Sequence, residues 1–125
     1  MKLLLIAVLI TLASLHTLAQ TYNDKYDGMN IDQALANKRL LKAYINCVLD
    51  AGKCTPEGKE LKGNISDALQ SGCVKCTGPQ RAGIRKVIAH LINHEERYWN
   101  QLVDKYDPKR LYSHKYENEL KAIKG

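Results

Sequence analysis

The chain has 125 residues, a length suited to one small domain with a single hydrophobic core. Its formal net charge is +6, and its 19 lysine and arginine residues are spread along the whole sequence. No stretch has the concentrated basic charge typical of nucleic-acid binding, so the composition argues against a nucleic-acid partner and indicates solvated helix faces.

Residues 1–19 are predicted to form a secretory signal peptide. The positive Met1-Lys2 pair precedes an apolar stretch, and Thr17 and Ala19 are small residues that suit cleavage after Ala19. A membrane anchor is the alternative, but the apolar run is shorter than the ~20 residues that a span requires. We therefore expect a secreted, extracellular protein with one domain, residues 20–125, in which four cysteines form disulfides by default.

The mature chain is predicted to be all-α, because its apolar residues recur at helical spacing and no stretch alternates like a strand. Asn30 can cap a short helix, which Asn37 interrupts. A longer helix then runs to about Asp50, and its apolar residues cover about half of its circumference. That coverage indicates a deeply buried helix, and the residues are Leu40, Leu41, Tyr44, Ile45, Val48 and Leu49.

All four cysteines lie in the middle of the chain, at Cys47, Cys54, Cys73 and Cys76. In a continuous helix the first two would be roughly 10 Å apart, whereas a disulfide needs Cα atoms about 4.4–6.8 Å apart. The chain must therefore turn between them, and Gly52 is suited to the left-handed conformation that ends a helix. The last two are close enough for one turn to bridge. We predict two local disulfides, Cys47–Cys54 and Cys73–Cys76, each at a helix junction.

Start signals mark the next two helices. Thr55-Pro56-Glu57 combines a capping threonine, a proline at the first helical position and an acid in the first turn. A central helix of about fifteen residues is expected to begin there. Thr77 or Gly78 then caps a further helix that begins at Pro79.

The apolar stripe of this further helix continues beyond Glu95, although Glu95 falls on the same face. Either one long helix tolerates Glu95, or the chain breaks near Asn93, which could cap a new helix with Glu96 three residues on. We favour the break. Asp107-Pro108 ends this segment, and a final, weaker helix is predicted over residues 111–123.

The cysteine spacing and several short motifs point to a known family. The gaps between the cysteines are six, eighteen and two residues, in an order that is highly specific. The motifs are Asn23-Asp24-Lys25-Tyr26-Asp27, Asn37-Lys38-Arg39-Leu40-Leu41, Gly52-Lys53-Cys54-Thr55-Pro56-Glu57-Gly58, Cys73-Val74-Lys75-Cys76-Thr77, Trp99 and Lys105-Tyr106-Asp107-Pro108. In these features the chain resembles the insect chemosensory protein family, over essentially its whole mature length.

The resemblance implies a compact bundle of about six helices around an internal apolar channel, with the two sequential disulfides that the spacing favours. It also implies a secreted carrier of small hydrophobic ligands, such as semiochemicals or fatty-acid-derived alcohols, esters and acids. Some members of that family are linked instead to development, cuticle or regeneration. One departure is Ser66, where many relatives have proline.

The candidate ligand-binding residues follow from the same resemblance. It places Tyr26, Tyr44, Tyr112 and Tyr116 along the channel or at its mouths. An alternative for Tyr44 is a core position in which its hydroxyl bonds to a neighbouring helix. The full set of candidates is Tyr26, Leu40, Tyr44, Ile45, Val48, Leu61, Ile65, Val87, Leu91, Tyr112 and Tyr116.

No motif supports catalysis, a metal or a cofactor. The C-x-x-C at Cys73 to Cys76 lacks the preceding strand of a thioredoxin-type site, and the six-residue gap after Cys47 is wide for a zinc pair. His90 and His94 have metal-ligand spacing but lie on the polar face of their helix, so we expect solvent exposure. We therefore predict a protein that is not an enzyme and needs no cofactor.

Two functional classes remain. The first is a monomeric carrier that binds a small hydrophobic ligand in an internal channel and does not insert stably into membranes. The second is a secreted signalling, developmental or defence protein that acts through its basic surface. Uptake of a lipophilic probe favours the first, whereas salt-sensitive binding to anionic membranes without such uptake favours the second.

Overall fold

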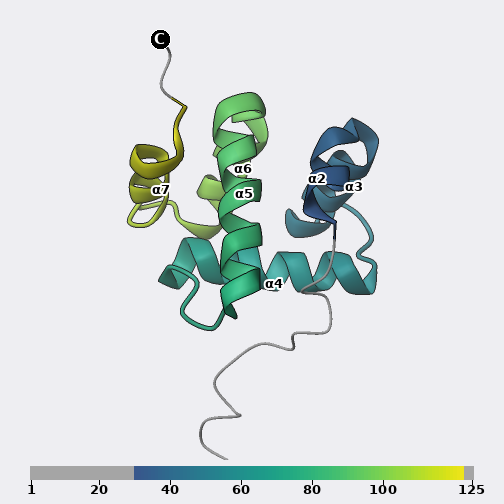
Figure 1. The fold of residues 1–125 in the computed structure, drawn as a ribbon, viewed down its shortest axis with the longest axis horizontal. Helices are drawn as coiled ribbons and strands as arrows, with labels where there is room; N and C mark the ends of the chain where they lie inside the picture. Colours follow the sequence, from purple (N-terminus) through teal and green to yellow (C-terminus); the bar gives the residue numbers. More distant parts are fainter. Residues whose placement is uncertain (1–29, 123–125) are drawn as a thin grey trace, which may run out of the picture.

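The structure, a computed structural model, describes residues 30–122 as an all-α fold, as predicted. Its helices are α2 (Ile31–Ala36), α3 (Lys38–Val48), α4 (Pro56–Ser71), α5 (Gly78–His94), α6 (Glu96–Tyr106) and α7 (Ser113–Leu120). In Figure 1, α4 runs across the base, α5 stands on it near the middle, α7 lies on one side of α5, and α2 and α3 lie on the other. The predicted signal peptide lies outside the described residues.

The predicted starts of four helices are confirmed by their capping side chains. Asn30, Asn37, Thr55 and Thr77 each accept a hydrogen bond from the backbone N–H three residues further on, at 3.0, 3.1, 3.1 and 3.2 Å. Each bond satisfies one of the N–H groups that a helix start leaves without an intrahelical partner. The side-chain oxygen of Gln80 in turn accepts a hydrogen bond from the backbone N–H of Thr77 at 2.9 Å, which completes a capping box.

The turn after α3 differs from its prediction. The helix ends at Val48, and the residue with a left-handed backbone is Asp50 (φ 59°), not Gly52. Aspartate tolerates this conformation better than most side chains do, and here its carboxylate forms ion pairs with Lys62 and Lys105. Gly52 matters for a different reason: a Cβ atom there would lie 3.2 Å from the Cβ of Asn46.

Both predicted disulfides are confirmed. Cys47 and Cys54 have Cα atoms 5.0 Å apart, and Cys73 and Cys76 have theirs 5.2 Å apart. The first bond closes the turn before α4, and the second closes the turn after it. Gly72, with φ 75°, supplies the left-handed residue that ends α4. The two disulfides therefore fix the chain at both ends of α4.

The predicted break between α5 and α6 is confirmed, but the prediction that Asn93 caps α6 is wrong. The chain leaves helical geometry at Glu95 (φ −139°, ψ 58°), and α6 has no side-chain cap. Asn93 still belongs to α5. Its amide nitrogen donates to the carbonyls of Ala89 and Leu120 at 2.8 and 2.9 Å, and its oxygen accepts from the N–H of Ala122 at 2.7 Å. Asn93 thus secures the end of α7, because three bonds satisfy its amide better than one cap would.

The last helix is shorter than predicted. It starts at Ser113, and Leu111, the predicted first residue, is exposed. Before the helix, the buried carboxylate of Asp107 accepts the N–H groups of Leu111, Tyr112 and Ser113 at 2.9, 3.0 and 2.7 Å. A tight loop, rather than a further helical turn, therefore leads into α7.

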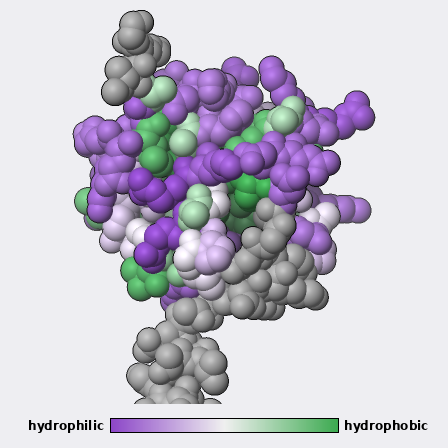
Figure 2. Space-filling view, in the orientation of Figure 1, coloured by the Kyte–Doolittle hydropathy of each residue, from purple (hydrophilic) through white to green (hydrophobic). Residues whose placement is uncertain are grey.

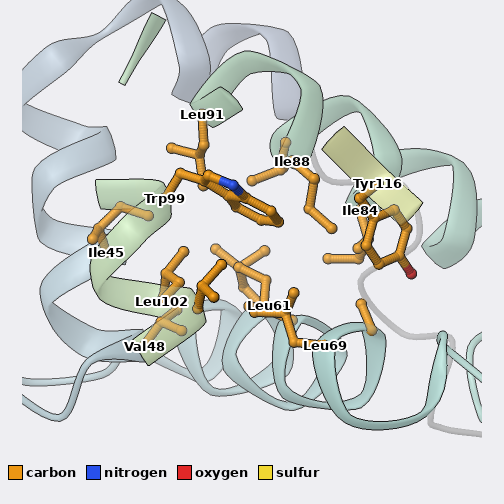
Figure 3. Packing of buried hydrophobic residues seen from close by; sticks show 14 of the residues in the cluster. Ile45, Val48, Leu61, Leu69, Ile84, Ile88, Leu91, Trp99, Leu102 and Tyr116 are labelled. Atoms are coloured by element: carbon orange, nitrogen blue, oxygen red, sulfur yellow. The ribbon is translucent and has the colours of Figure 1, made fainter. Parts of the chain in front are cut away.

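One hydrophobic core joins the helices, with Trp99 of α6 in its middle. Figure 3 shows Leu91, Ile88, Leu61 and Leu102 around the indole ring. The indole nitrogen donates to Glu117 of α7 at 2.8 Å, so the buried ring keeps its polar atom satisfied. Among residues 30–122, no helix is both long and apolar enough to cross a bilayer.

Candidate ligand-binding site

A small apolar cavity lies where α2, α3, α4 and α5 meet. Its volume is about 20 Å³, which is about the space of a single water molecule. Its lining is aliphatic apart from one aromatic ring, and consists of Ile31, Ala34, Leu35, Leu41, Tyr44, Ile45, Leu61 and Val87. An alkyl chain fits this site only if the lining moves apart.

The wall formed by α2 is the one most able to move. Its apolar residues are only half-buried, and no residue of α2 is fully buried. A Cβ atom added at Gly83 of α5 would lie 3.6 Å from the side chain of Ile31, and Lys86 of α5 pairs with Asp32 at 2.7 Å. Both partners of that ion pair are exposed, so it contributes little to holding α2 in place. The helix α2 therefore resembles a lid on the cavity.

Tyr44 supplies the one aromatic ring of the cavity lining, and the surface that faces the cavity is apolar throughout. The residue is half-buried, its ring lines the cavity, and its hydroxyl has no hydrogen-bond partner among the residues that the structure describes. The alternative considered for Tyr44, a hydroxyl bonded to a neighbouring helix, is thus not what residues 30–122 show. A free hydroxyl beside an apolar space can bind the head group of an amphipathic ligand.

The structure brings together four of the eleven sequence-predicted site residues at this cavity: Tyr44, Ile45, Leu61 and Val87. Three others, Val48, Ile65 and Leu91, are buried in the core without lining the cavity. Leu40 is 36% exposed, at the start of α3. Tyr26 lies outside the described residues.

Four lining residues were not among the predicted candidates: Ile31, Ala34, Leu35 and Leu41. The helical spacing of the first three was visible in the sequence, but a six-residue helix gives too short a pattern to separate a lid from a surface helix.

Tyr112 and Tyr116 lie elsewhere. They line a second pocket, of about 400 Å³, between α7, the end of α4 and the first turns of α5. In Figure 3, Tyr116 and Ile45 occupy opposite ends of the core, with Trp99 between them. Figure 2 shows apolar surface on both sides of α5, toward α2 and toward α7, each area bordered by hydrophilic side chains. The predicted tyrosines therefore divide between two separate sites.

The histidine pair of α5 is only partly in solvent. His94 is exposed as predicted, whereas His90 is half-buried, and the two rings have centroids 5.1 Å apart. Burial lowers the pKa of His90, and the nearby His94 adds to that effect, while Glu95 opposes it. Among residues 30–122, the one cluster of three possible metal ligands is Asp67, Cys73 and Cys76, whose sulfurs are already joined in a disulfide.

Comparison with known proteins agrees with this fold. The profile of the insect pheromone-binding family A10/OS-D matches residues 22–114. The allergen Tha p 1 of Thaumetopoea pityocampa is 44% identical over 99% of this chain and 98% of its own length. An antennal chemosensory protein A6 from the moth Mamestra brassicae superposes with a TM-score of 0.72 at 52% identity, covering 74% of this chain and 90% of that one. A chemosensory protein in complex with bromo-dodecanol superposes with a TM-score of 0.74 at 54% identity, and the match covers 79% of this chain and 99% of that one.

Proposed function

The chain belongs to the insect pheromone-binding family A10/OS-D, and on that basis we propose that it is a secreted, monomeric carrier of small hydrophobic molecules. The ligands are fatty-acid-derived alcohols, esters or acids. The observation that carries this proposal is the apolar cavity between α2, α3, α4 and α5, which the ring of Tyr44 lines together with aliphatic side chains. The two disulfides fit an extracellular location.

Binding requires the cavity to widen. A relative that is 54% identical has been solved with bromo-dodecanol, a ligand whose size far exceeds a cavity of about 20 Å³. Because α2 is the least buried wall, we infer that the ligand displaces α2 outward and then lies along Ile45, Leu61 and Val87. The alkyl chain gains about 25 cal/mol for each Å² removed from water, which offsets the cost of moving the lid.

The test is displacement of a lipophilic fluorescent probe from the mature chain by a series of straight-chain alcohols, esters and acids. Affinity is expected to rise with chain length and then fall once the chain exceeds the widened cavity. A second series measures binding to anionic vesicles at two salt concentrations. Salt-sensitive vesicle binding without any probe uptake would reject the carrier and favour a protein that acts through its basic surface.

A further inference from the structure

The pocket between α5 and α7 differs in chemistry from the cavity beneath α2. Three cations, Arg81, Arg85 and Lys115, border it, together with a single carboxylate, Glu119. At about 400 Å³, it lies in the size range of small-molecule sites. The pocket therefore combines an excess of positive charge with an apolar floor.

Most of that charge has no acidic partner. Arg85 pairs with Glu119 at 3.0 Å, which uses the only carboxylate of the pocket. Arg81 donates to the carbonyl of Cys73 at 3.0 Å, so its charge is held in place but not neutralised. Lys115 is exposed and forms no ion pair within the described part of the chain. Arg81 and Lys115 therefore border the pocket without an ion-pair partner among residues 30–122.

The floor of the pocket is apolar and firmly held. Ile84 and Tyr116 belong to the buried core, and Tyr112 packs beside Gly72, where a Cβ atom would lie 3.4 Å from the ring. The hydroxyl of Tyr116 points away from the core in Figure 3. Burial raises the pKa of this hydroxyl, although Arg85 and Arg81 oppose the shift, so at neutral pH it is protonated and can donate a hydrogen bond.

We propose that this pocket is a second binding site, which takes small amphipathic carboxylates: a carboxylate head held by Arg81 and Lys115, and a short apolar body on the Tyr112 and Tyr116 rings. Charge-assisted hydrogen bonds to arginine and lysine favour a carboxylate over a neutral alcohol. The site stands apart from the carrier cavity, because α5 lies between them (Figure 1). It does not depend on the carrier function.

The test uses the mature chain with hexanoate and hexanol as probes, measured by calorimetric titration at low salt. Lys115→Glu reverses a charge that no residue of the described chain compensates. We expect hexanoate affinity to fall by about fivefold or more, since an ionic contact is replaced by repulsion, and hexanol affinity to stay unchanged. Lys115→Arg keeps the positive charge and should bind hexanoate about as tightly as the parent does. Lys59→Glu makes the same charge change at an exposed residue of α4 outside the pocket, and should leave both affinities near those of the parent.

Chemical shifts of backbone amides locate the probe. Hexanoate is expected to move the signals of Gly72 and Tyr116, and to bind the Tyr44→Ala variant as tightly as the parent. An equal loss in Lys115→Glu and Lys59→Glu would overturn the proposal, since net charge alone would explain it. Loss of hexanoate binding in Tyr44→Ala would overturn it too, because the acid would then occupy the carrier cavity. A different result would reject the carrier proposal: neither hexanol nor longer alcohols would bind the parent.

Discussion

Tyr44 combines an aromatic ring with a hydroxyl group, and the contributions of the two to binding can be separated by substitution. Its ring borders the apolar cavity, and its hydroxyl has no partner within the described residues. The ring contributes buried area for any ligand, whereas the hydroxyl contributes only when the ligand has a polar head.

Replacing Tyr44 tests both roles. In Tyr44→Phe, affinity for dodecanol should fall by roughly two- to tenfold, because one hydrogen bond is worth about 0.5–1.5 kcal/mol, while affinity for an apolar probe should hold. Tyr44→Ala should change the affinity for all long-chain ligands several-fold while circular dichroism still shows a helical protein. The control is Lys121→Ala, an exposed position outside the cavity lining. If Tyr44→Ala binds every ligand as the parent does, Tyr44 is not part of the channel wall.

Asp107 orders the loop before α7 through three backbone N–H groups. Asp107→Ala leaves these groups without an acceptor, so the free energy of unfolding should fall by roughly 2 kcal/mol, as measured by urea denaturation. Asp107→Asn keeps one acceptor oxygen and should lose less. Equal stability of the alanine variant and the parent would show that water replaces the carboxylate without cost.

Burial acts to raise the pKa of Asp107, but the hydrogen bonds from Ser113, Tyr112 and Leu111 outweigh it, so the pKa lies below its ordinary value of 3.8. The native state therefore favours the ionised form. This contribution to stability is complete above the ordinary pKa and is lost as the pH falls through the folded pKa. The loop before α7 is accordingly a part of the molecule that weakens in strong acid.

At the scale of elements, α2 and α4 differ strongly in how deeply they are buried. The apolar face of α2 is half-buried, whereas α4 contributes fully buried residues such as Ile65 and Leu69 to the core and is closed by a disulfide at each end. A lid needs the first kind of packing, because elements with few buried contacts open at low free energy.

Two identical substitutions distinguish a lid from a core element. Leu35→Ala in α2 should speed ligand dissociation several-fold in stopped-flow measurements, while the free energy of unfolding changes by about 1 kcal/mol or less. Leu69→Ala in α4, at a fully buried position, should instead cost about 2–5 kcal/mol of stability. Unchanged dissociation in Leu35→Ala would mean that ligands enter by another route.

We expect His90, in the groove between α2 and α5, to make the stability of the protein depend on pH. His90 shares its groove with Asp32, Lys86 and His94, and its pKa lies below its ordinary value of 6.5. The folded state thus binds fewer protons than the unfolded state, and stability is lost as the pH falls below 6.5 toward the folded pKa. The urea midpoint should decrease between pH 7.5 and pH 5.5, and His90→Gln should flatten this slope. A midpoint with the same slope in both proteins would assign the effect to other groups.

Across the whole molecule, the two disulfides hold α4 beneath a core that separates two sites. Replacing both cysteines of either pair by serine removes a constraint on the unfolded chain that is worth roughly 2–3 kcal/mol on the chain-entropy model. The Cys47–Cys54 disulfide closes the longer loop, so its loss should lower the free energy of unfolding slightly more than loss of the Cys73–Cys76 disulfide. Both double variants should stay helical, since the aliphatic and aromatic side chains of the core are unchanged, and urea denaturation provides the measurement. Loss of the fold in either variant would show that the disulfide organises the core itself.

The sequence by itself determined the class of the fold, the starts of α2 to α5, a break in the chain close to Asn93 and the two disulfides. Each depends on residues only a few positions apart, such as Thr55 and Gly58 or Cys73 and Cys76. Interactions of such short range follow from local backbone geometry, so they can be predicted without knowledge of how the helices cross.

Only the tertiary structure decided what each apolar or polar side chain meets. Val48 and Ile45 belong to the same helical stripe, yet Ile45 lines the cavity and Val48 does not. Asn93, which could have capped a helix, bonds instead to the end of α7. Tyr44 lies in a different site from Tyr112 and Tyr116 because α5 stands between them (Figure 1). A core stripe and a channel wall have the same hydrophobic periodicity, and the difference between them arises only from how closely the facing helices pack.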